Sequence, residues 1–251
     1  MSTALKRSPV LIRVPRPGAR VRLFCFPYAG GGAAVFRDWP AALPADIEVA
    51  AVQLPGREWR IKEAPLASLT ALAQDALAAI QPYLDKPFAL LGASMGGTLI
   101  FELARRLRQA QLPAPCCLLP LAVGGPQTPE TELLHNLPDS EFIAELRAFG
   151  VMSEEFLQHA ELVELALPVL RADCVAQETY VYQPEAPFEF PIWAYGGRSD
   201  ATVPEERLAE WAELTTGVSQ VQMIDGGHLF MDGQPELLMQ SLARRIYQSL
   251  P

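Results

Sequence analysis

The sequence is poor in the residues that build metal centres, disulfide frameworks and nucleic-acid-binding faces. Three of its 251 residues are histidine and four are cysteine, and no Cys-x-x-Cys pair or zinc-ligand spacing occurs. We therefore expect reduced, buried thiols and no metal. The chain carries 20 basic and 29 acidic residues, a net charge of −9. Because phosphate contacts need a basic face, this balance argues against a nucleic-acid partner.

Long apolar runs are missing as well. No stretch of 18 apolar residues occurs, so we expect neither a membrane-spanning helix nor a membrane partner. Residues 1–9 lack the apolar core and the cleavage site of a signal peptide. A cytoplasmic location is therefore expected.

Apolar strands alternate with amphipathic helices along most of the chain. Strands are expected over residues 21–26, 47–53, 88–91, 116–123, 192–196 and 218–224, and helices over 35–43, 69–80, 98–107, 208–214 and 236–250. This alternation predicts an α/β fold, in which helices cover both faces of a mostly parallel sheet. The length suits a single large domain over residues 1–251.

One region breaks the alternation. Residues 128–187 are mostly helical in pattern, with one helix starting near Leu137 and one or two more over 153–178. Pro168 is expected to break this last segment. A helical insert between two sheet strands is typical of a lid over an active site, although a helical decoration without a gating role has the same pattern.

Residues 88–97 carry the most informative motif. Four apolar residues, then Gly92-Ala93-Ser94-Met95-Gly96, then a helix, form the G-x-S-x-G nucleophile elbow in its strand–turn–helix context. The turn strains the serine backbone, and glycines let the strand and helix pass closely. Ser94 is therefore the candidate nucleophile, with a plain glycine-rich turn as the alternative.

A nucleophilic serine needs a base, and three histidines are available. His135 and His159 lie in the helical insert. His228 follows the last expected strand, and the two glycines before it permit a tight loop at the sheet edge. Position and loop chemistry both select His228.

The base needs an orienting carboxylate. Asp200 lies in the loop after the strand at 192–196, at the carboxyl edge of the sheet, where sites gather. Asp225 is the main rival because it lies three residues before His228. Asp173 and Asp232 are weaker candidates.

The order Ser94, Asp200, His228 is the one expected for α/β-hydrolases, which predicts that fold with the helical lid over 128–187 inserted in it. An oxyanion hole there consists of two backbone N–H groups. One should belong to Met95, the residue after the nucleophile. The other should belong to Ala29, in the glycine-rich loop after the first strand.

Five stretches carry a family resemblance: Leu23-Phe-Cys-Phe-Pro-Tyr-Ala-Gly-Gly-Gly, Gln53-Leu-Pro-Gly-Arg-Glu, Leu91-Gly-Ala-Ser-Met-Gly-Gly, Leu170-Arg-Ala-Asp-Cys-Val-Ala-Gln-Glu-Thr-Tyr and Gly226-Gly-His-Leu-Phe. Together they resemble the stand-alone type II thioesterases that accompany non-ribosomal peptide and polyketide synthases. The resemblance covers nearly the whole chain. One departure is Ala93, where the family usually has a histidine before the nucleophile.

The resemblance implies hydrolysis of acyl or aminoacyl thioesters on the phosphopantetheine arm of acyl or peptidyl carrier proteins. Such enzymes clear stalled or mis-primed groups from the assembly line. It implies a Ser-His-Asp triad and an acyl-enzyme, with no metal or organic cofactor, because the phosphopantetheine belongs to the substrate. A monomer is the expected state, since nothing requires more.

Docking and acyl recognition leave alternatives open. Two groups of basic residues could meet a carrier protein, or could be solvated surface charge: Arg57, Arg60 and Lys62, and Arg105, Arg106 and Arg108. Three apolar residues of the insert could line the acyl pocket, or could form the core of amphipathic helices: Phe142, Met152 and Phe156.

Two other functions fit the same residues less well. A small-molecule carboxylesterase or lipase of this fold would use the same triad, but the chain lacks the His-Gly-Gly-Gly loop of lipases. A non-catalytic binding protein of this fold commonly loses the serine or the histidine, and both are present here.

Overall fold

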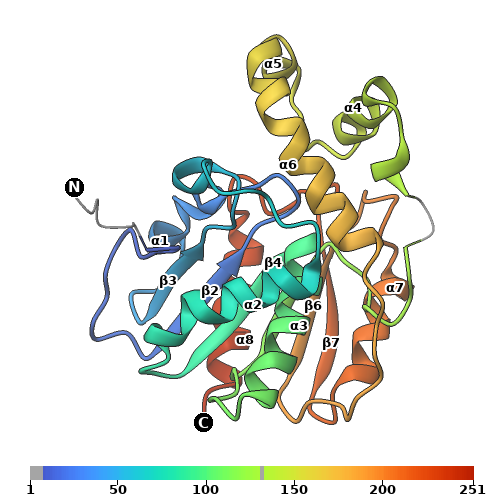
Figure 1. Cartoon of the computed structure of the whole chain (residues 1–251). Coiled ribbons are helices and arrows are strands. Elements are labelled where there is room, and N and C mark those ends of the chain that lie inside the picture. Colours follow the sequence, from blue (N-terminus) through green and yellow to red (C-terminus); the bar gives the residue numbers. More distant parts are fainter. Residues whose placement is uncertain (1–7, 131–132) are drawn as a thin grey trace.

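The computed structural model describes residues 8–130 and 133–251. Its centre is a seven-stranded β-sheet (Figure 1). Its strands lie in the order β1-β3-β2-β4-β5-β6-β7. Every neighbouring pair from β3 to β7 is parallel, as the α/β pattern predicts. The strands are β1 Val10–Leu11, β2 Val21–Phe26, β3 Ile47–Val52, β4 Phe88–Ala93, β5 Leu118–Leu121, β6 Ile192–Gly197 and β7 Ser219–Ile224.

The edge strand β1 was not indicated by the sequence pattern. It pairs antiparallel with β3, with Val10 opposite Val52 and Leu11 opposite Ala51. Two residues are too few to show an alternating or continuous apolar pattern. Their strand conformation therefore follows from the sheet edge against which they lie.

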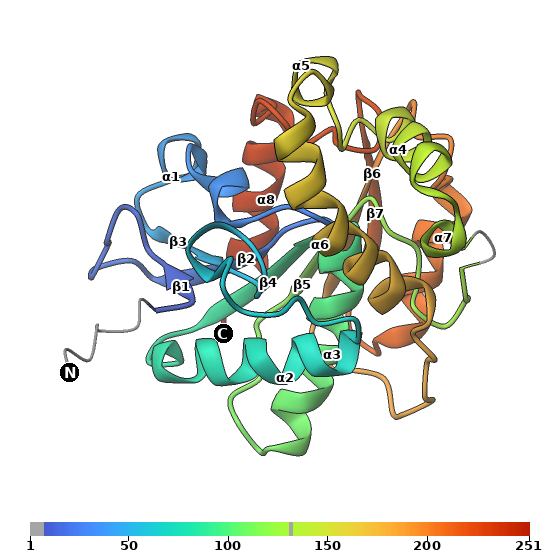
Figure 2. The ribbon, with the colours of Figure 1, turned by 45° about the horizontal axis from the view of Figure 1, so that its top comes forward.

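Helices cover both faces of the sheet, with α2 and α3 on one face and α1 and α8 on the other (Figure 2). All residues of β2, β3 and β4 are buried, which is why these strands appear as continuous apolar runs. Neighbouring residues of β4 serve opposite faces: Leu90 packs in the core with α2 and α3, and Leu91 packs in the core with α1 and α8.

The helices and 3-10 turns differ from the expected ranges mainly at their ends. Two segments expected as single helices are divided: 35–43 into η1 and α1, and 208–214 into α7 and η5. Strand β5 is shorter than the expected strand 116–123. The elements are η1 Ala33–Phe36, α1 Trp39–Ala42, η2 Glu58–Arg60, α2 Leu69–Ile80, η3 Gln81–Tyr83, α3 Met95–Gln109, η4 Leu134–Asn136, α4 Asp139–Ala148, α5 Glu154–Leu157, α6 Ala160–Glu178, α7 Glu205–Ala209, η5 Glu210–Leu214 and α8 Glu236–Gln248.

The helical insert stands above the carboxyl ends of the strands and consists of η4, α4, α5 and α6 (Figures 1 and 2). The expected break at Pro168 is wrong, because Pro168 lies inside the 19-residue helix α6. The break comes earlier, at Gln158–His159, between α5 and α6. Burial of Val169 and Leu170 directly after the proline offsets the hydrogen bond that proline cannot donate.

The cysteines form no disulfide in the structure. All four cysteines are free; Cys25, Cys117 and Cys174 are buried and Cys116 is half-buried. Among the described residues, no helix combines the length and apolar character needed to cross a bilayer.

Candidate active site

Ser94 lies on a strained turn between β4 and α3. Its backbone has φ 49° and ψ −119°, a conformation that few side-chain-bearing residues adopt. A Cβ on Gly92 would lie 1.9 Å from the carbonyl oxygen of Gly96, and a Cβ on Gly96 would lie 2.5 Å from that of Phe26. Only glycine fits both positions, so strand and helix approach closely and the serine projects from the sheet edge.

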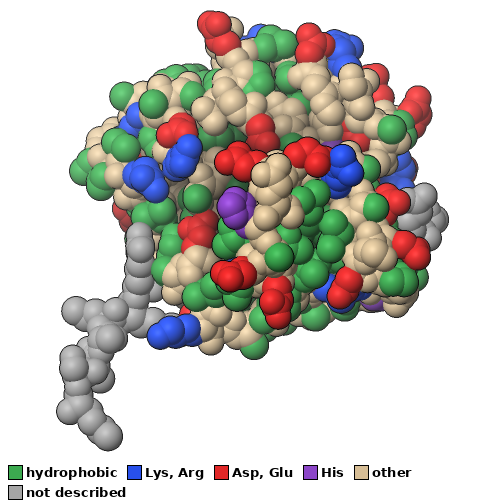
Figure 3. Space-filling view, turned by 90° about the horizontal axis from the view of Figure 1, so that it is seen from above, with side chains coloured by type: hydrophobic (Ala, Val, Ile, Leu, Met, Phe, Trp, Pro, Cys, Tyr) green, Lys and Arg blue, Asp and Glu red, His purple; other side chains and the backbone are tan. Residues whose placement is uncertain are grey.

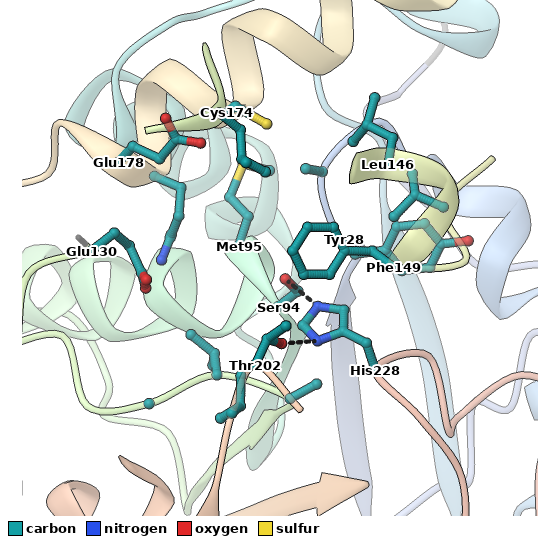
Figure 4. Close-up of a pocket in the computed structure, with 18 of the residues that line it drawn as sticks. Tyr28, Ser94, Met95, Glu130, Leu146, Phe149, Cys174, Glu178, Thr202 and His228 are labelled. Carbon is teal, nitrogen blue, oxygen red and sulfur yellow. Dashed lines mark hydrogen bonds between the residues drawn. The ribbon is translucent and has the colours of Figure 1, made fainter. Parts of the chain in front are cut away.

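His228 reaches Ser94 from the loop after β7. Its Nε2 lies 3.0 Å from Ser94 Oγ (Figure 4). Gly226 in this loop has φ 135°, which a side chain would disfavour. The two-glycine loop thus brings the imidazole over the elbow.

Asp200 completes the arrangement from the loop after β6. Its Oδ2 lies 2.8 Å from His228 Nδ1, and its side chain is 1% exposed. Burial by itself would raise the pKa of Asp200, but hydrogen bonds from His228 and Thr202 outweigh burial and lower that pKa. The carboxylate therefore stays ionised, which fixes the imidazole tautomer with Nε2 free to accept the serine proton.

The structure brings Ser94, His228 and Asp200 together, and places the rival residues elsewhere. His135 pairs with Glu178 through Nδ1, and His159 precedes α6. The side chain of Asp225 is 92% exposed and pairs with Arg198. Of the weaker carboxylate candidates, Asp173 is buried in another ion pair and Asp232 is exposed.

A cavity of about 360 Å³ opens beside the serine and histidine. It lies between the sheet edge and the insert, with side chains from both pointing into it (Figure 4). Ala29 and Met95 line it, and no hydrogen bond to either backbone N–H is made by the described residues. Both residues expected to supply oxyanion donors therefore lie at the cavity.

The insert supplies apolar side chains to the cavity, but not those that the sequence singled out. Leu146, Phe149 and Val151 line it. Phe142 and Met152 are instead buried in the insert's own core, with Phe156 packed against them, which is the plainer of the two interpretations. The helical pattern marks the apolar face of α4 but not which of its residues lie at the edge of that face.

Two residues next to the triad were not predicted from the sequence. The Phe149 ring packs edge-on against the His228 ring, with centroids 5.5 Å apart. Thr202 donates its backbone N–H and its hydroxyl to Asp200 Oδ1, over 2.9 and 2.6 Å. The Asp200-x-Thr202 spacing is a signal for the second contact, because such turns commonly bond a carboxylate to the residue two positions on.

Three of the six basic residues considered for docking are held in buried ion pairs. Arg57 pairs with Asp173, Arg60 with Glu63 and Asp75, and Arg105 with Glu102 and Glu185; the three guanidinium side chains are 6–7% exposed. Viewed from above, Lys and Arg are scattered among acidic and apolar side chains and form no continuous patch (Figure 3). Neither the docking role nor the solvated surface role fits Arg57, Arg60 and Arg105.

Residues 8–130 and 133–251 contain no candidate metal site, because no three His, Cys, Asp or Glu side chains are grouped closely enough to hold an ion.

Ala93, at the family's usual histidine position, is fully buried and packs with the core on the α1 and α8 side of the sheet.

Comparison with known proteins gives a consistent result. The model of the thioesterase domain family matches residues 21–247. The chain is 44% identical over 214 residues to the gramicidin S biosynthesis protein GrsT of Aneurinibacillus migulanus, covering 85% of this chain and 84% of that protein. It is 37% identical over 221 residues to the thioesterase PikA5 of Streptomyces venezuelae, covering 88% and 79%.

A solved structure supports the same family. YbtT, the type II thioesterase from the yersiniabactin NRPS/PKS biosynthetic pathway, matches with a TM-score of 0.87 and 30% identity over 97% of this chain and 100% of that one.

Proposed function

Because the chain belongs to the thioesterase family, we propose that it removes acyl or aminoacyl groups from the phosphopantetheine arms of carrier proteins. It is a hydrolase that acts on thioesters, and its relatives are type II thioesterases of peptide and polyketide assembly. The observation that carries the proposal is the Ser94–His228–Asp200 hydrogen-bonded chain, which opens into a cavity walled by the insert. In this role the enzyme clears mis-primed or stalled groups.

The proposed chemistry passes through an acyl-enzyme. His228 Nε2 takes the proton of Ser94 while Oγ attacks the thioester carbonyl, and the N–H groups of Ala29 and Met95 hold the oxyanion. The C–S bond then breaks, and the thiol leaves with the proton from His228. Its pKa of about 8.5 makes it a better leaving group than an alcohol.

Water completes the cycle. It attacks the Ser94 ester as His228 takes its proton, and the acid and free serine are released. All proton transfers use the imidazole that Asp200 orients, and no step calls for a metal or organic cofactor.

We assign the insert over 128–187 the role of a lid. Its residues Leu146, Phe149 and Val151 line the same cavity as Ser94, so they would exclude water from the acyl group once it is bound. The arm would enter beside this wall, and the acyl group would lie against the apolar side chains.

The test is acetate release from an acetylated carrier protein, compared with acetyl-pantetheine and with a matched oxygen ester. Wild-type enzyme should release acetate fastest from the carrier, and Ser94→Ala should lower the rate by at least about 10³-fold. Equal rates on carrier-bound and free thioesters would contradict carrier specificity. A preference for the oxygen ester would point to a small-molecule esterase.

A further inference from the structure

A buried ion pair lies beside the loop that carries Ala29. Arg57 comes from the segment after β3 and Asp173 comes from α6. Their two contacts are 2.6 Å (Nη1 to Oδ2) and 2.8 Å (Nη2 to Oδ1), a bidentate arrangement. The side chains are 6% and 0% exposed. Neither residue lines the cavity, and neither has a part in the acyl transfer described above.

Both partners of the pair also bond the backbone of this loop. Asp173 Oδ2 accepts from the Gly30 N–H at 2.7 Å, and Arg57 Nη1 donates to the Gly31 carbonyl at 3.3 Å. Each charge therefore contacts its partner and one backbone group of the residues directly after Ala29. The ion pair and the loop form one connected network.

The turn at residues 28–31 determines where the Ala29 N–H points. Gly31 N–H donates to the Tyr28 carbonyl at 2.9 Å, and Gly30 has φ 77°, as the third residue of a type II turn does. The Tyr28 carbonyl and the Ala29 N–H belong to one planar trans peptide and point in opposite directions. A carbonyl bonded inside the turn therefore leaves the Ala29 N–H facing outward.

Other contacts hold the same loop from the sides. A Cβ on Gly30 would lie 2.3 Å from Leu170 Cδ2, so α6 packs directly onto this glycine. Gln53 Oε1 accepts from the Ala33 N–H at 2.9 Å, and its amide nitrogen donates to the Arg57 carbonyl at 3.3 Å. The loop is thus fixed by side chains from two other segments of the chain.

We propose that Asp173 and Arg57 are positioning residues of the oxyanion hole, which hold the turn at Gly30 and Gly31 so that the Ala29 N–H faces the reacting carbonyl. The inference rests on the proposed function, because it takes Ala29 as an oxyanion donor. A buried ion pair is often no more stabilising than apolar residues of similar size. The directional bonds to Gly30 and Gly31 are what an apolar pair could not supply.

The test compares Asp173→Asn with a matched control, Asp75→Asn. Asp75 forms the neighbouring bidentate pair with Arg60, at 2.6 and 2.8 Å, and makes no hydrogen bond to the loop at residues 28–33. Both changes remove one carboxylate charge from a guanidinium at nearly constant volume. Arg57→Lys is a second variant that keeps the charge and gives up the bidentate fork.

Two ligands separate oxyanion binding from ground-state binding. A trifluoromethyl ketone analogue of acetyl-pantetheine places a hemiketal oxyanion in the hole, and the matched thioether without a carbonyl does not. In Asp173→Asn and Arg57→Lys we expect kcat for acetyl-pantetheine to fall about 10- to 100-fold, below the effect of deleting a whole donor. KM should change by less than about threefold, inhibition by the ketone should weaken in parallel with kcat, and inhibition by the thioether should stay constant.

Asp75→Asn should lower the melting temperature and leave kcat within about twofold of wild type. The inference is overturned if Asp173→Asn melts lower but keeps wild-type kcat, or if both inhibitors weaken equally. If one of the two variants does not fold, as judged by circular dichroism, the other decides. A wild-type enzyme without thioesterase activity would instead contradict the proposed function, and ketone binding would still test the positioning role.

Discussion

Asp200 accepts more hydrogen bonds than the orientation of His228 alone requires. One oxygen faces His228 Nδ1, and the other accepts both the N–H and the hydroxyl of Thr202. The second pair of contacts prevents rotation of the carboxylate and offsets the cost of its burial. The imidazole is therefore oriented by a group that is itself fixed.

Replacement of Asp200 by asparagine should lower kcat about 10³- to 10⁴-fold, because the amide favours the wrong imidazole tautomer. Steady-state hydrolysis of an acyl-pantetheine thioester measures this. Asp225→Asn is the matched control, and its exposed pair with Arg198 predicts an unchanged kcat. A comparable loss in Asp225→Asn would refute the assignment of Asp200.

Residues marked by a local sequence pattern could be predicted, whereas contacts between distant segments of the chain could not. Ser94, His228 and Asp200 each lie in a short segment whose strand and turn pattern is visible in the sequence. Arg57 was considered as a docking residue and Asp173 as a weaker alternative to Asp200, but their ion pair was not predicted, because it joins segments 116 residues apart. No local pattern reports which acid meets which base across a fold.

Helix α6 has two halves with different surroundings. Before Pro168, Leu162 and Leu165 are 47% and 61% exposed. After it, Leu170 and Cys174 are buried against the rest of the insert and the loop at Gly30. The sequence predicted that the helix would break at Pro168. The helix continues through Pro168, and what changes there is the packing, from exposed to buried side chains. Helix propensity alone predicts a break at proline, because it does not include the burial of the side chains that follow, which offsets the one lost backbone hydrogen bond.

Amide exchange should reflect this division. We expect amides of residues 161–167 to exchange at least about 10-fold faster than those of 170–177, because few buried contacts oppose opening of the first half. Hydrogen–deuterium exchange with mass spectrometry measures this. Helix α8 is the control, since its buried residues are spread from Leu238 to Ile246 and predict similar protection in both halves. Uniform protection along α6 would contradict the expectation.

The molecule as a whole contains a buried charge pair near the amino ends of its strands, away from the active site. Arg22 on β2 lies opposite Glu48 on β3, and the side chains are 7% and 4% exposed. Burial would raise the pKa of Glu48, but hydrogen bonds from the Arg16 N–H and the Arg22 guanidinium outweigh it and lower that pKa. The alternation of apolar strands and amphipathic helices predicted this sheet, but not that two of its buried positions would be charged.

Glu48→Gln should lower the free energy of unfolding by about 3 kcal/mol at pH 7, since it leaves Arg22 buried with less compensation. Because the pKa of Glu48 is lower in the folded state, its contribution is complete above the ordinary glutamate value of about 4.3. The contribution is lost as the pH falls through the folded value.

Urea unfolding at pH 7 and pH 3 should therefore give a smaller difference between wild type and Glu48→Gln at pH 3. The exposed Glu164→Gln serves as control, with an expected change within about 0.5 kcal/mol. A difference that stays constant with pH would show that the ionisation of Glu48 contributes nothing to stability.

The cavity wall contains a thiol as well as a serine, and the two are potential competitors for the same acyl group. Cys174 lines the cavity, and burial, together with the charges of Glu178 and Asp173, raises the pKa of its thiol to about 12. At pH 7 this thiol is therefore protonated, whereas the thiolate is the nucleophilic form. Transthioesterification onto Cys174 would simply exchange one thioester for another and leave the enzyme acylated. We therefore expect the acyl group to be transferred to Ser94 and not to Cys174.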